Sequence, residues 1–187
     1  MPYPSQINAE TILHTAREMI ATDGVDHLSL NKLASAMGVK APSLYRYYNS
    51  KTALLRAVNE DTMARLLEAL QPALALDVSP FDRSMEVARR YRQFAHDNAA
   101  VYGMLFTNTL TGLHIENEFI AGMIGPFVRM MALVCGDDCA RSALRGFLAL
   151  AHGFVMMELA DQFNQSLDPL DVYESSMRAY LHGWEAA

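Results

Sequence analysis

The sequence predicts an all-α protein with about nine helices in two domains, over residues 1–55 and 56–187. Apolar residues recur along most of the chain with the 3.6-residue period of a helix that buries one face. No segment shows the strict alternation of apolar and polar residues that marks a half-buried strand. Gly, Asn, Asp and Pro stand between the periodic segments, where they end one helix or begin the next.

Two short helices are predicted near the N-terminus, after a longer one. The first helix covers Asn8–Thr22 and ends at Gly24, because glycine adopts the positive φ of a helix C-cap without strain. Ser29 can cap the second helix, since its hydroxyl accepts from a backbone N–H that has no partner within the helix. The second helix covers Leu30–Met37, and Gly38 ends it.

Proline and serine mark the starts of the next two helices. Ala41-Pro42 begins a third helix, because proline is tolerated in a first turn, and this helix is expected to run through Tyr47 or Tyr48. Ser50 caps a fourth helix that continues to about Leu70, and the two prolines of Gln71–Pro80 predict a connection. Five further helices are expected at about Phe81–Asn98, Ala99–Leu110, Asn117–Val134, Asp138–Gln162 and Leu170–Trp184.

The net charge of −6 is spread unevenly along the chain. Residues 1–60 hold six Lys or Arg and five Asp or Glu, whereas the remaining residues hold nine and sixteen. Within residues 27–59 there is no acidic residue, and the basic ones are Lys32, Lys40, Arg46, Lys51 and Arg56. This distribution is typical of a phosphate-facing head on an acidic body, although a solvated helix face could also show it.

The two short helices and their glycine-containing turn have the pattern of a helix-turn-helix. The stretch Ser29–Lys51 resembles the N-terminal domain of TetR/AcrR-family regulators. The resemblance rests on Leu44-Tyr45, followed by a basic residue, an aromatic position and Ser-Lys. It implies a three-helix DNA-binding domain whose third helix enters the major groove.

The resemblance also implies a role for each position of the motif. Ala41, Ser43 and Tyr47 would face base edges, Tyr45 and Lys51 would bind phosphates, and Lys40 would stand at the entry of the recognition helix. Tyr48 is interpreted as a core residue. The full set of predicted DNA-binding residues is Ser29, Lys40, Ala41, Ser43, Tyr45, Arg46, Tyr47 and Lys51.

The C-terminal part predicts a dimer interface. Ala143–Ala160 is apolar on nearly every face, so one side should face its own domain and the other a partner subunit. The family resemblance implies a homodimer in which the last two helices of each subunit form a four-helix bundle. Leu148–Glu158 also resembles the family's Trp-His-Gly type of C-terminal domain, with Ala151 in the Trp position. The candidate interface residues are Phe147, Phe154, Val155, Met177, Leu181 and Trp184.

The middle helices are rich in aromatic and Met side chains, which line adaptable pockets but more often simply fill a core. The resemblance implies an effector pocket here, and its apolar lining favours a small hydrophobic molecule. For His152 a buried, hydrogen-bonded histidine is the favoured interpretation, and contact with the effector is the alternative. The candidate pocket residues are Tyr91, Phe94, Phe106, Met123, Phe127, His152 and Met156.

The resulting hypothesis is a cytoplasmic, homodimeric transcriptional regulator. It would bind double-stranded DNA at an inverted repeat, as a repressor that a small hydrophobic effector releases. No catalytic residue, cofactor, metal or membrane association is predicted, since the chain has no Glu-x-x-His pair, Walker loop or His-Glu-x-x-His motif. The alternatives are an all-α enzyme or metal carrier, and a ligand-binding bundle that no longer binds DNA.

The two cysteines of the chain, Cys135 and Cys139, are too few for a disulfide framework. They are interpreted as two reduced thiols near a helix start, and a redox or metal switch is the alternative.

Overall fold

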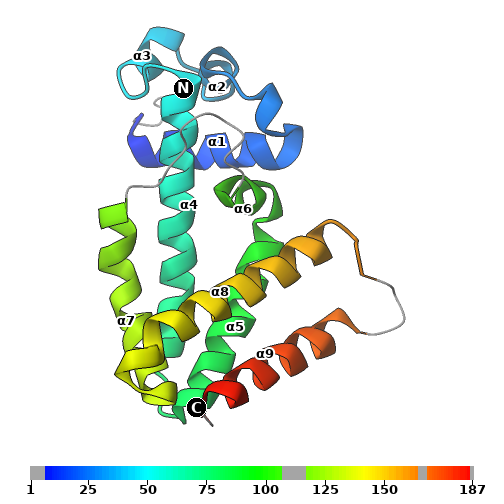
Figure 1. Ribbon diagram of the computed structural model, residues 1–187. Coiled ribbons are helices and arrows are strands. Elements are labelled where there is room, and N and C mark those ends of the chain that lie inside the picture. The colour runs from blue at the N-terminus through cyan, green and yellow to red at the C-terminus, as the bar shows by residue number, and fades with distance from the viewer. Residues whose placement is uncertain (1–6, 107–116, 164–167, 186–187) are drawn as a thin grey trace. The chain divides into compact units, whose positions relative to one another are not determined.

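The computed structural model describes residues 7–106, 117–163 and 168–185. In these ranges it has nine α-helices, one short 3-10 helix and no strand (Figure 1). The prediction of an all-α fold is confirmed. The helices are α1 (Ala9–Asp23), α2 (Leu30–Ala36), α3 (Ala41–Tyr45), α4 (Lys51–Leu74), α5 (Pro80–Asp97), α6 (Ala99–Phe106), α7 (Asn117–Cys135), α8 (Asp137–Leu159) and α9 (Pro169–Glu185), with the 3-10 helix at Val25–His27.

The first helix begins and ends where the sequence predicts. The Asn8 side chain accepts from the Thr11 N–H at 2.8 Å, and the Thr11 side chain accepts from the Asn8 N–H at 3.2 Å, which is a reciprocal capping box. Gly24 follows the helix with φ +83° and ψ 158°, a conformation that is essentially restricted to glycine. Both ends of α1 are therefore set by local residues.

Two predicted boundaries differ from the structure. The third helix ends at Tyr45 instead of at Tyr47 or Tyr48. Helix α4 continues to Leu74 through Pro72, where a connection was predicted. Pro72 removes one backbone donor, but Leu70 and Ala73 on either side of it are buried. The burial of these two residues outweighs the lost hydrogen bond, so the helix continues for another turn.

The chain forms two compact units. The N-terminal unit comprises Met1–Ala64 and Asn98–Ile115, and the C-terminal unit comprises Arg65–Asp97 and Glu116–Ala187. Helix α4 contributes residues to both units, and α6 belongs to the N-terminal unit although it follows α5 in the chain.

The N-terminal unit has one hydrophobic core. Helix α6 packs against α1, and Val101 and Met104 of α6 join the core that α1 to α4 form. Arg17 on α1 forms a part-buried ion pair with Asp61 on α4. The largest fully buried side chains of this core include Ile12, Ile20, Leu28, Leu33, Leu44 and Leu54.

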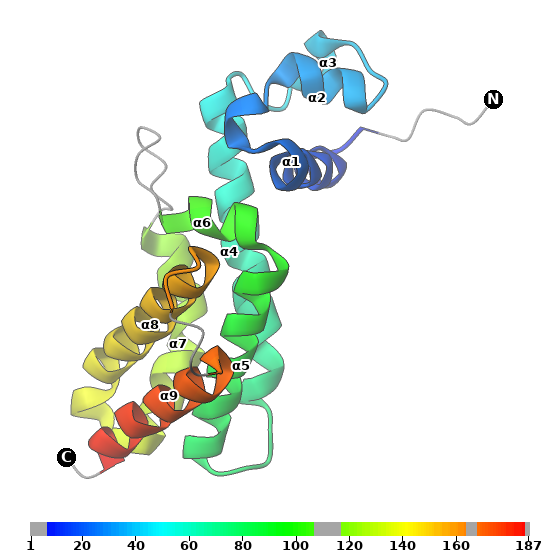
Figure 2. The same cartoon turned by 90° about the vertical axis from the view of Figure 1, so that its right-hand side faces the viewer.

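In the C-terminal unit, α5, α7, α8 and α9 pack against one another, and α8 and α9 lie side by side in both views (Figures 1 and 2). The Tyr173 hydroxyl on α9 donates to the Ala88 carbonyl on α5 at 2.8 Å. Burial raises the pKa of Tyr173, so this phenol stays protonated and keeps its role as a donor. The Tyr180 hydroxyl donates to the Ala143 carbonyl at 2.8 Å, which joins α9 to α8.

The structure contains a bond that the sequence interpretation did not include. Cys135 and Cys139, interpreted as two reduced thiols, are joined by a disulfide across the junction of α7 and α8 in this structure. Their Cα atoms are 6.0 Å apart, which lies within the range that a disulfide can bridge.

No helix in the described ranges has the length and apolar character needed to cross a membrane.

Candidate nucleic-acid interface

The turn between α2 and α3 is a Schellman motif built on Gly38. The Val39 N–H donates to the Ala34 carbonyl at 2.9 Å and the Gly38 N–H donates to the Ser35 carbonyl at 3.1 Å. Gly38 has φ +67°, which only glycine adopts without a steric penalty. Val39 is partly buried against the core of the unit, and this contact directs the chain into α3. The tight turn predicted from Gly38 is therefore present.

The ends of the two short helices are fixed by the predicted capping residues. The Ser29 hydroxyl accepts from the Lys32 N–H at 3.2 Å at the start of α2. Pro42 lies in the first turn of α3, which Lys40 precedes in an extended conformation. These caps make helices of only seven and five residues possible, with the core contacts of Leu33 and Leu44 behind them.

The side chains of the α3 region divide into an inner and an outer set. Leu44 is fully buried, and Tyr48 is half-buried against the core. Burial, assisted by the carboxylates of Asp61 and Glu60, raises the pKa of Tyr48. On the outer side Tyr45 is 49% exposed and Tyr47 is 45% exposed. Two large aromatic side chains exposed within three residues give this segment a surface that a partner can contact.

Basic side chains surround the two tyrosines in the sequence. Lys40 and Arg46 are exposed, as is Lys32 on α2, which the prediction did not include in the interface. Ala41, Ser43 and Ser29 are half-buried, and the hydroxyl of Ser29 is engaged as the cap of α2. The α3 region thus presents aromatic, basic and small polar side chains, which suit phosphate and base-edge contacts.

Two of the predicted DNA-binding residues also hold the unit together. The Tyr47 hydroxyl donates to the Ile7 carbonyl at 2.8 Å, and the Lys51 ammonium donates to the Asp26 carbonyl at 3.2 Å. The first bond joins the segment after α3 to the residue before the cap of α1, and the second joins the start of α4 to the 3-10 helix. Sequence reasoning missed these contacts because their acceptors are backbone carbonyls, which carry no residue signature.

The predicted pocket residues mostly lie in the interior of the C-terminal unit. Tyr91, Phe94 and Phe127 are buried, and Met123, His152 and Met156 are half-buried. Burial lowers the pKa of His152, so its neutral form is favoured. Phe106 is the last residue of α6, and its side chain lies outside the described part of the structure.

Four of the six predicted interface residues fill the subunit's own core. Phe147, Val155, Met177 and Leu181 have no exposed surface, whereas Phe154 and Trp184 are half-buried. The outer faces of the same two helices carry other side chains. These are Ala149, Gly153 and Met157 on α8 and Ser175 and Ala179 on α9, all of them exposed.

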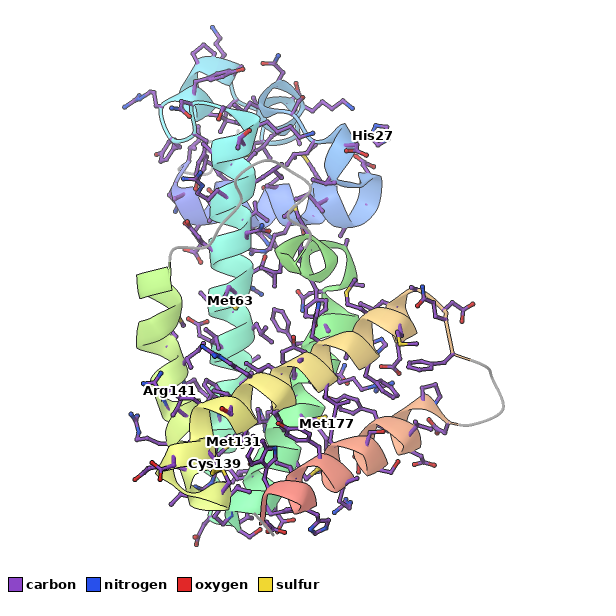
Figure 3. The ribbon with its side chains drawn as sticks, viewed as in Figure 1. His27, Met63, Met131, Cys139, Arg141 and Met177 are labelled. Carbon is purple, nitrogen blue, oxygen red and sulfur yellow. A yellow bond between two sulfur atoms is a disulfide. The ribbon has the colours of Figure 1, made fainter. Side chains whose placement is uncertain are left out.

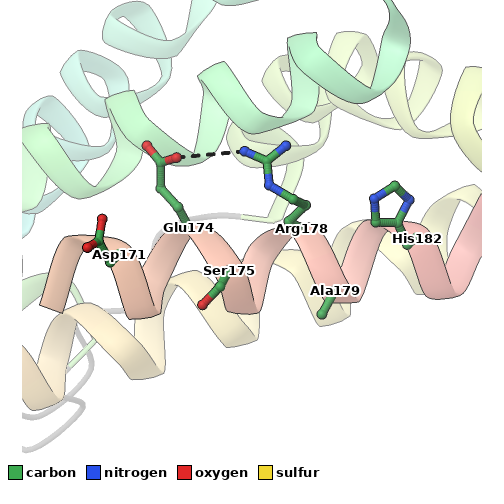
Figure 4. Close-up of a pocket in the computed structure, with 6 residues that line it drawn as sticks. All are labelled: Asp171, Glu174, Ser175, Arg178, Ala179 and His182. Carbon is green, nitrogen blue, oxygen red and sulfur yellow. Dashed lines mark ion pairs between the residues drawn. The ribbon is translucent and has the colours of Figure 1, made fainter. Parts of the chain in front are cut away.

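An open groove of about 430 Å³ lies along α9 (Figure 4). Two of its lining residues, Glu174 and Arg178, form an ion pair with 3.8 Å between the charged groups. Of the predicted pocket residues that the structure describes, none lines this groove. Its lining residues are Asp171, Glu174, Ser175, Arg178, Ala179 and His182.

A charged cluster in the C-terminal unit was not predicted. Arg92 on α5 makes two hydrogen bonds to Glu158 on α8, at 2.9 and 2.6 Å, and the His96 ring lies 3.1 Å from the same carboxylate. The Glu158 side chain is only 5% exposed. Burial alone would raise its pKa, but the hydrogen bonds from Arg92 and His96 lower it, so Glu158 is an anion.

Family models match both the N-terminal and the C-terminal part of this chain. The family described as "Bacterial regulatory proteins, tetR family" matches residues 12–58, and "Tetracyclin repressor-like, C-terminal domain" matches residues 84–180. The HTH-type transcriptional regulator Rv0681 of Mycobacterium tuberculosis is 29% identical over 164 residues, which cover 83% of this chain and 72% of that protein. The HTH-type transcriptional regulator YobS of Bacillus subtilis is 28% identical, covering 95% of this chain and 92% of that protein.

Solved structures share the fold. A singly substituted TetR from Acinetobacter baumannii AYE, in complex with minocycline, superposes with a TM-score of 0.71 at 22% identity, covering 97% of this chain and 98% of that one. The two family matches together span the α3 region and most of the C-terminal unit. This chain therefore belongs to the TetR family of bacterial transcriptional regulators, which are helix-turn-helix DNA-binding proteins and not enzymes.

Proposed function

We propose that this protein is a repressor that binds an inverted-repeat operator as a homodimer and leaves it when a small hydrophobic molecule binds. The observation that carries the proposal is the outer side of the α3 region. Tyr45 and Tyr47 are each about half exposed there, and basic residues flank them in the sequence. We place its action in the cytoplasm, where the operator DNA lies.

On DNA, we propose that Ala41, Ser43 and Tyr47 face the bases of the major groove. Lys40, Tyr45, Arg46 and Lys51 would contact phosphates. Small, hydroxyl and aromatic side chains discriminate bases by apolar and single hydrogen-bond contacts, so phosphate contacts should dominate the affinity and make it fall steeply with salt. Ser29 would act indirectly, because its hydroxyl caps α2.

The homodimer is proposed to form through the outer faces of α8 and α9. Gly153, Ala149 and Ala179 are exposed and small, which allows the helices of a second subunit to approach closely. Ala179 also lines the open groove along α9. Phe147, Val155, Met177 and Leu181 would support this surface from the core, with Phe154 and Trp184 at its edge.

The effector is proposed to bind among α5, α7 and α8, where the aromatic and Met side chains of the predicted pocket gather. Met side chains adapt to varied apolar ligands by changing rotamer. The TetR relative from Acinetobacter baumannii was solved with minocycline, a small molecule. An effector that prefers the conformation with low DNA affinity would weaken operator binding by the ratio of its two affinities, typically about 5–150-fold.

The first test is selection of random duplex DNA by the purified protein at a fixed, moderate salt concentration. The native chain should enrich an inverted repeat, and a Lys40→Ala, Tyr45→Ala double variant should enrich nothing. Arg141→Ala, an exposed basic residue on α8, is the matched control and should enrich the same repeat. No enrichment by the native chain would contradict DNA binding and favour a ligand-binding bundle.

The second test needs the operator that the first supplies. Small molecules that raise the melting temperature of the protein are added to the protein–operator complex. An effector should lower operator affinity, and operator DNA should lower effector affinity by the same factor. Ligand and DNA affinities that are independent of each other in the same buffer would exclude release by that molecule.

A further inference from the structure

We propose that Cys135 and Cys139 are a redox modification site, a disulfide that forms and breaks reversibly at the junction of α7 and α8. Cys135 is the last residue of α7, Cys139 lies in the first turn of α8, and the two are bonded. Figure 3 shows Cys139 near this junction, with Arg141 further along α8. The transcriptional role of the protein does not use this pair.

Both cysteines can be reached from solvent. Each is half-buried, and the intervening Gly136, Asp137 and Asp138 are all exposed. Oxidants and reductants can therefore act on the sulfur atoms without unfolding of the unit. Exposed disulfides are more often the labile, regulatory ones.

The cellular compartment decides whether the two cysteines are reduced or oxidised, and this step rests on the proposed function. A protein that binds chromosomal DNA works in the reducing cytoplasm, where thiol systems keep accessible cysteines reduced. Cytoplasmic disulfides are usually transient and serve catalysis or redox sensing. The pair is thus a dithiol in the resting cell and a disulfide after exposure to an oxidant.

A peroxide is the class of oxidant that fits the site. One thiolate attacks a peroxide oxygen, which breaks the O–O bond and leaves a sulfenic acid and one molecule of water. The second thiol attacks the sulfenic sulfur, which forms the S–S bond and releases a second molecule of water. Two electrons leave the sulfurs and reduce the peroxide, and a dithiol reductant reverses the change by exchange.

The charges beside the pair favour a neutral oxidant. Asp137 and Asp138 precede Cys139 and Arg141 follows it, which leaves a net charge of −1 around the sulfurs. The dipole at the start of α8 favours a thiolate on Cys139. The two carboxylates oppose it, as do the carbonyl oxygens of Cys135 and Gly136 that lie against its Sγ atom. An uncharged peroxide is not repelled by this surface, but an anionic disulfide such as oxidised glutathione is.

Oxidation should stiffen the junction. Gly136 has φ +87° and is the only residue between α7 and α8, so its torsions set the angle of the two helices. A bond between Cys135 and Cys139 closes a small ring around Gly136 and limits those torsions. Met131 and Ala140 on either side are buried, so the restriction extends into the core of the C-terminal unit.

The test counts thiols in the full-length protein before and after hydrogen peroxide. Since the chain has only two cysteines, the reduced protein should have two reactive thiols and the oxidised protein none. The mass of the chain should fall by two hydrogen atoms, and dithiothreitol should restore both thiols. Oxidation should also raise the melting temperature by roughly 2–6 °C and slow amide exchange around Gly136.

The Cys135→Ser, Cys139→Ser double variant is the control, and its melting temperature should not respond to peroxide. Two thiols that persist in peroxide, a gain of oxygen atoms without an S–S bond, or a disulfide between two chains would each overturn the proposal. None of these measurements uses DNA. A chain that forms the disulfide but enriches no operator would contradict the proposed function and leave the chemistry of the site intact.

Discussion

Gly146 sets how closely α8 and α9 can pack. A Cβ atom at this position would lie 2.9 Å from Tyr180 Cζ, and the Tyr180 ring is held by its hydrogen bond to the Ala143 carbonyl. Gly146→Ala is therefore expected to destabilise the protein by about 1–3 kcal/mol, as measured by urea unfolding. In a Tyr180→Ala background the same substitution should be neutral or stabilising, and an equal loss there would contradict the steric explanation.

Asn59 on α4 is a buried polar residue without a visible structural benefit. It is 1% exposed, and neither its amide nitrogen nor its amide oxygen has a hydrogen-bond partner among the described residues. Because unpaired buried polar groups cost about 1–3 kcal/mol, Asn59→Leu is expected to raise the melting temperature by roughly 2–6 °C. Asn31→Leu, at an exposed position of α2, should leave it unchanged. A fall in the melting temperature of Asn59→Leu would show that the amide is needed.

Glu158 should make the protein sensitive to acid. Its folded-state pKa is lowered, so the unfolded chain takes up the proton first as the pH falls. The stability that Glu158 contributes is present above its unfolded value of 4.5 and is lost as the pH falls through the folded value. Urea unfolding between about pH 7 and pH 3 should show this loss. Glu158→Gln should be less stable at neutral pH and less dependent on acid, and an unchanged acid profile would contradict the assignment.

At the scale of a helix, the C-termini of α2 and α8 place two different residue types, glycine and aspartate, in the same left-handed backbone conformation. Gly38 after α2 and Asp161 after α8 both have positive φ, and both stand in Schellman motifs. At Asp161 the Gln162 N–H donates to the Met157 carbonyl at 2.9 Å. Glycine takes this conformation freely, whereas aspartate does so at a steric cost.

Opposite substitutions should therefore have opposite effects. Gly38→Ala is expected to destabilise the protein by about 1 kcal/mol and Asp161→Gly to stabilise it by about 0.5–1 kcal/mol, both measured by urea unfolding. Gly38→Ala should also weaken binding to the selected operator, because the turn places α3. Equal effects of the two substitutions would contradict the role of backbone conformation.

Helix boundaries that depend on nearby residues could be predicted from the sequence, whereas boundaries that depend on tertiary packing could not. Ser29, Gly38 and Pro42 act on residues within four positions of themselves, so the sequence predicts the ends of α2 and the start of α3 correctly. Helix α4 continues through Pro72 because Leu70 and Ala73 are buried. This burial depends on residues far away in the sequence, so no local pattern predicts it.

Long-range pairs were also beyond sequence reasoning. Arg92 and Glu158 are 66 residues apart, and Tyr47 and Ile7 are 40 apart. The apolar pattern of α8 does not predict which face of the helix is buried, for another reason. When nearly every face of a helix is apolar, the period no longer tells which face the subunit buries, so Phe147 and Val155 could be predicted as buried but not on which side.

At the scale of the whole molecule, the proposed homodimer can be tested by adding one charge to the helix face that would form the interface. Gly153→Glu and Ala179→Glu each introduce a carboxylate on the outer face of α8 or α9, and two-fold symmetry repeats it in the partner. Each variant should sediment as a monomer and bind the selected operator about 10-fold more weakly or worse. Ala75→Glu, an exposed position in the same unit, is the matched control. Variants that remain dimeric would exclude these two faces.

The hydrogen bond from Tyr47 to the Ile7 carbonyl limits what this tyrosine can offer to DNA. Its hydroxyl hydrogen is already donated, so toward a base the hydroxyl oxygen can only accept, and the ring offers an apolar surface. Among the groups in the major groove, the methyl group of thymine is the natural partner for an aromatic ring. Exchange of thymine for deoxyuridine at single operator positions would remove that methyl alone, and the position that loses affinity would identify the base pair under Tyr47.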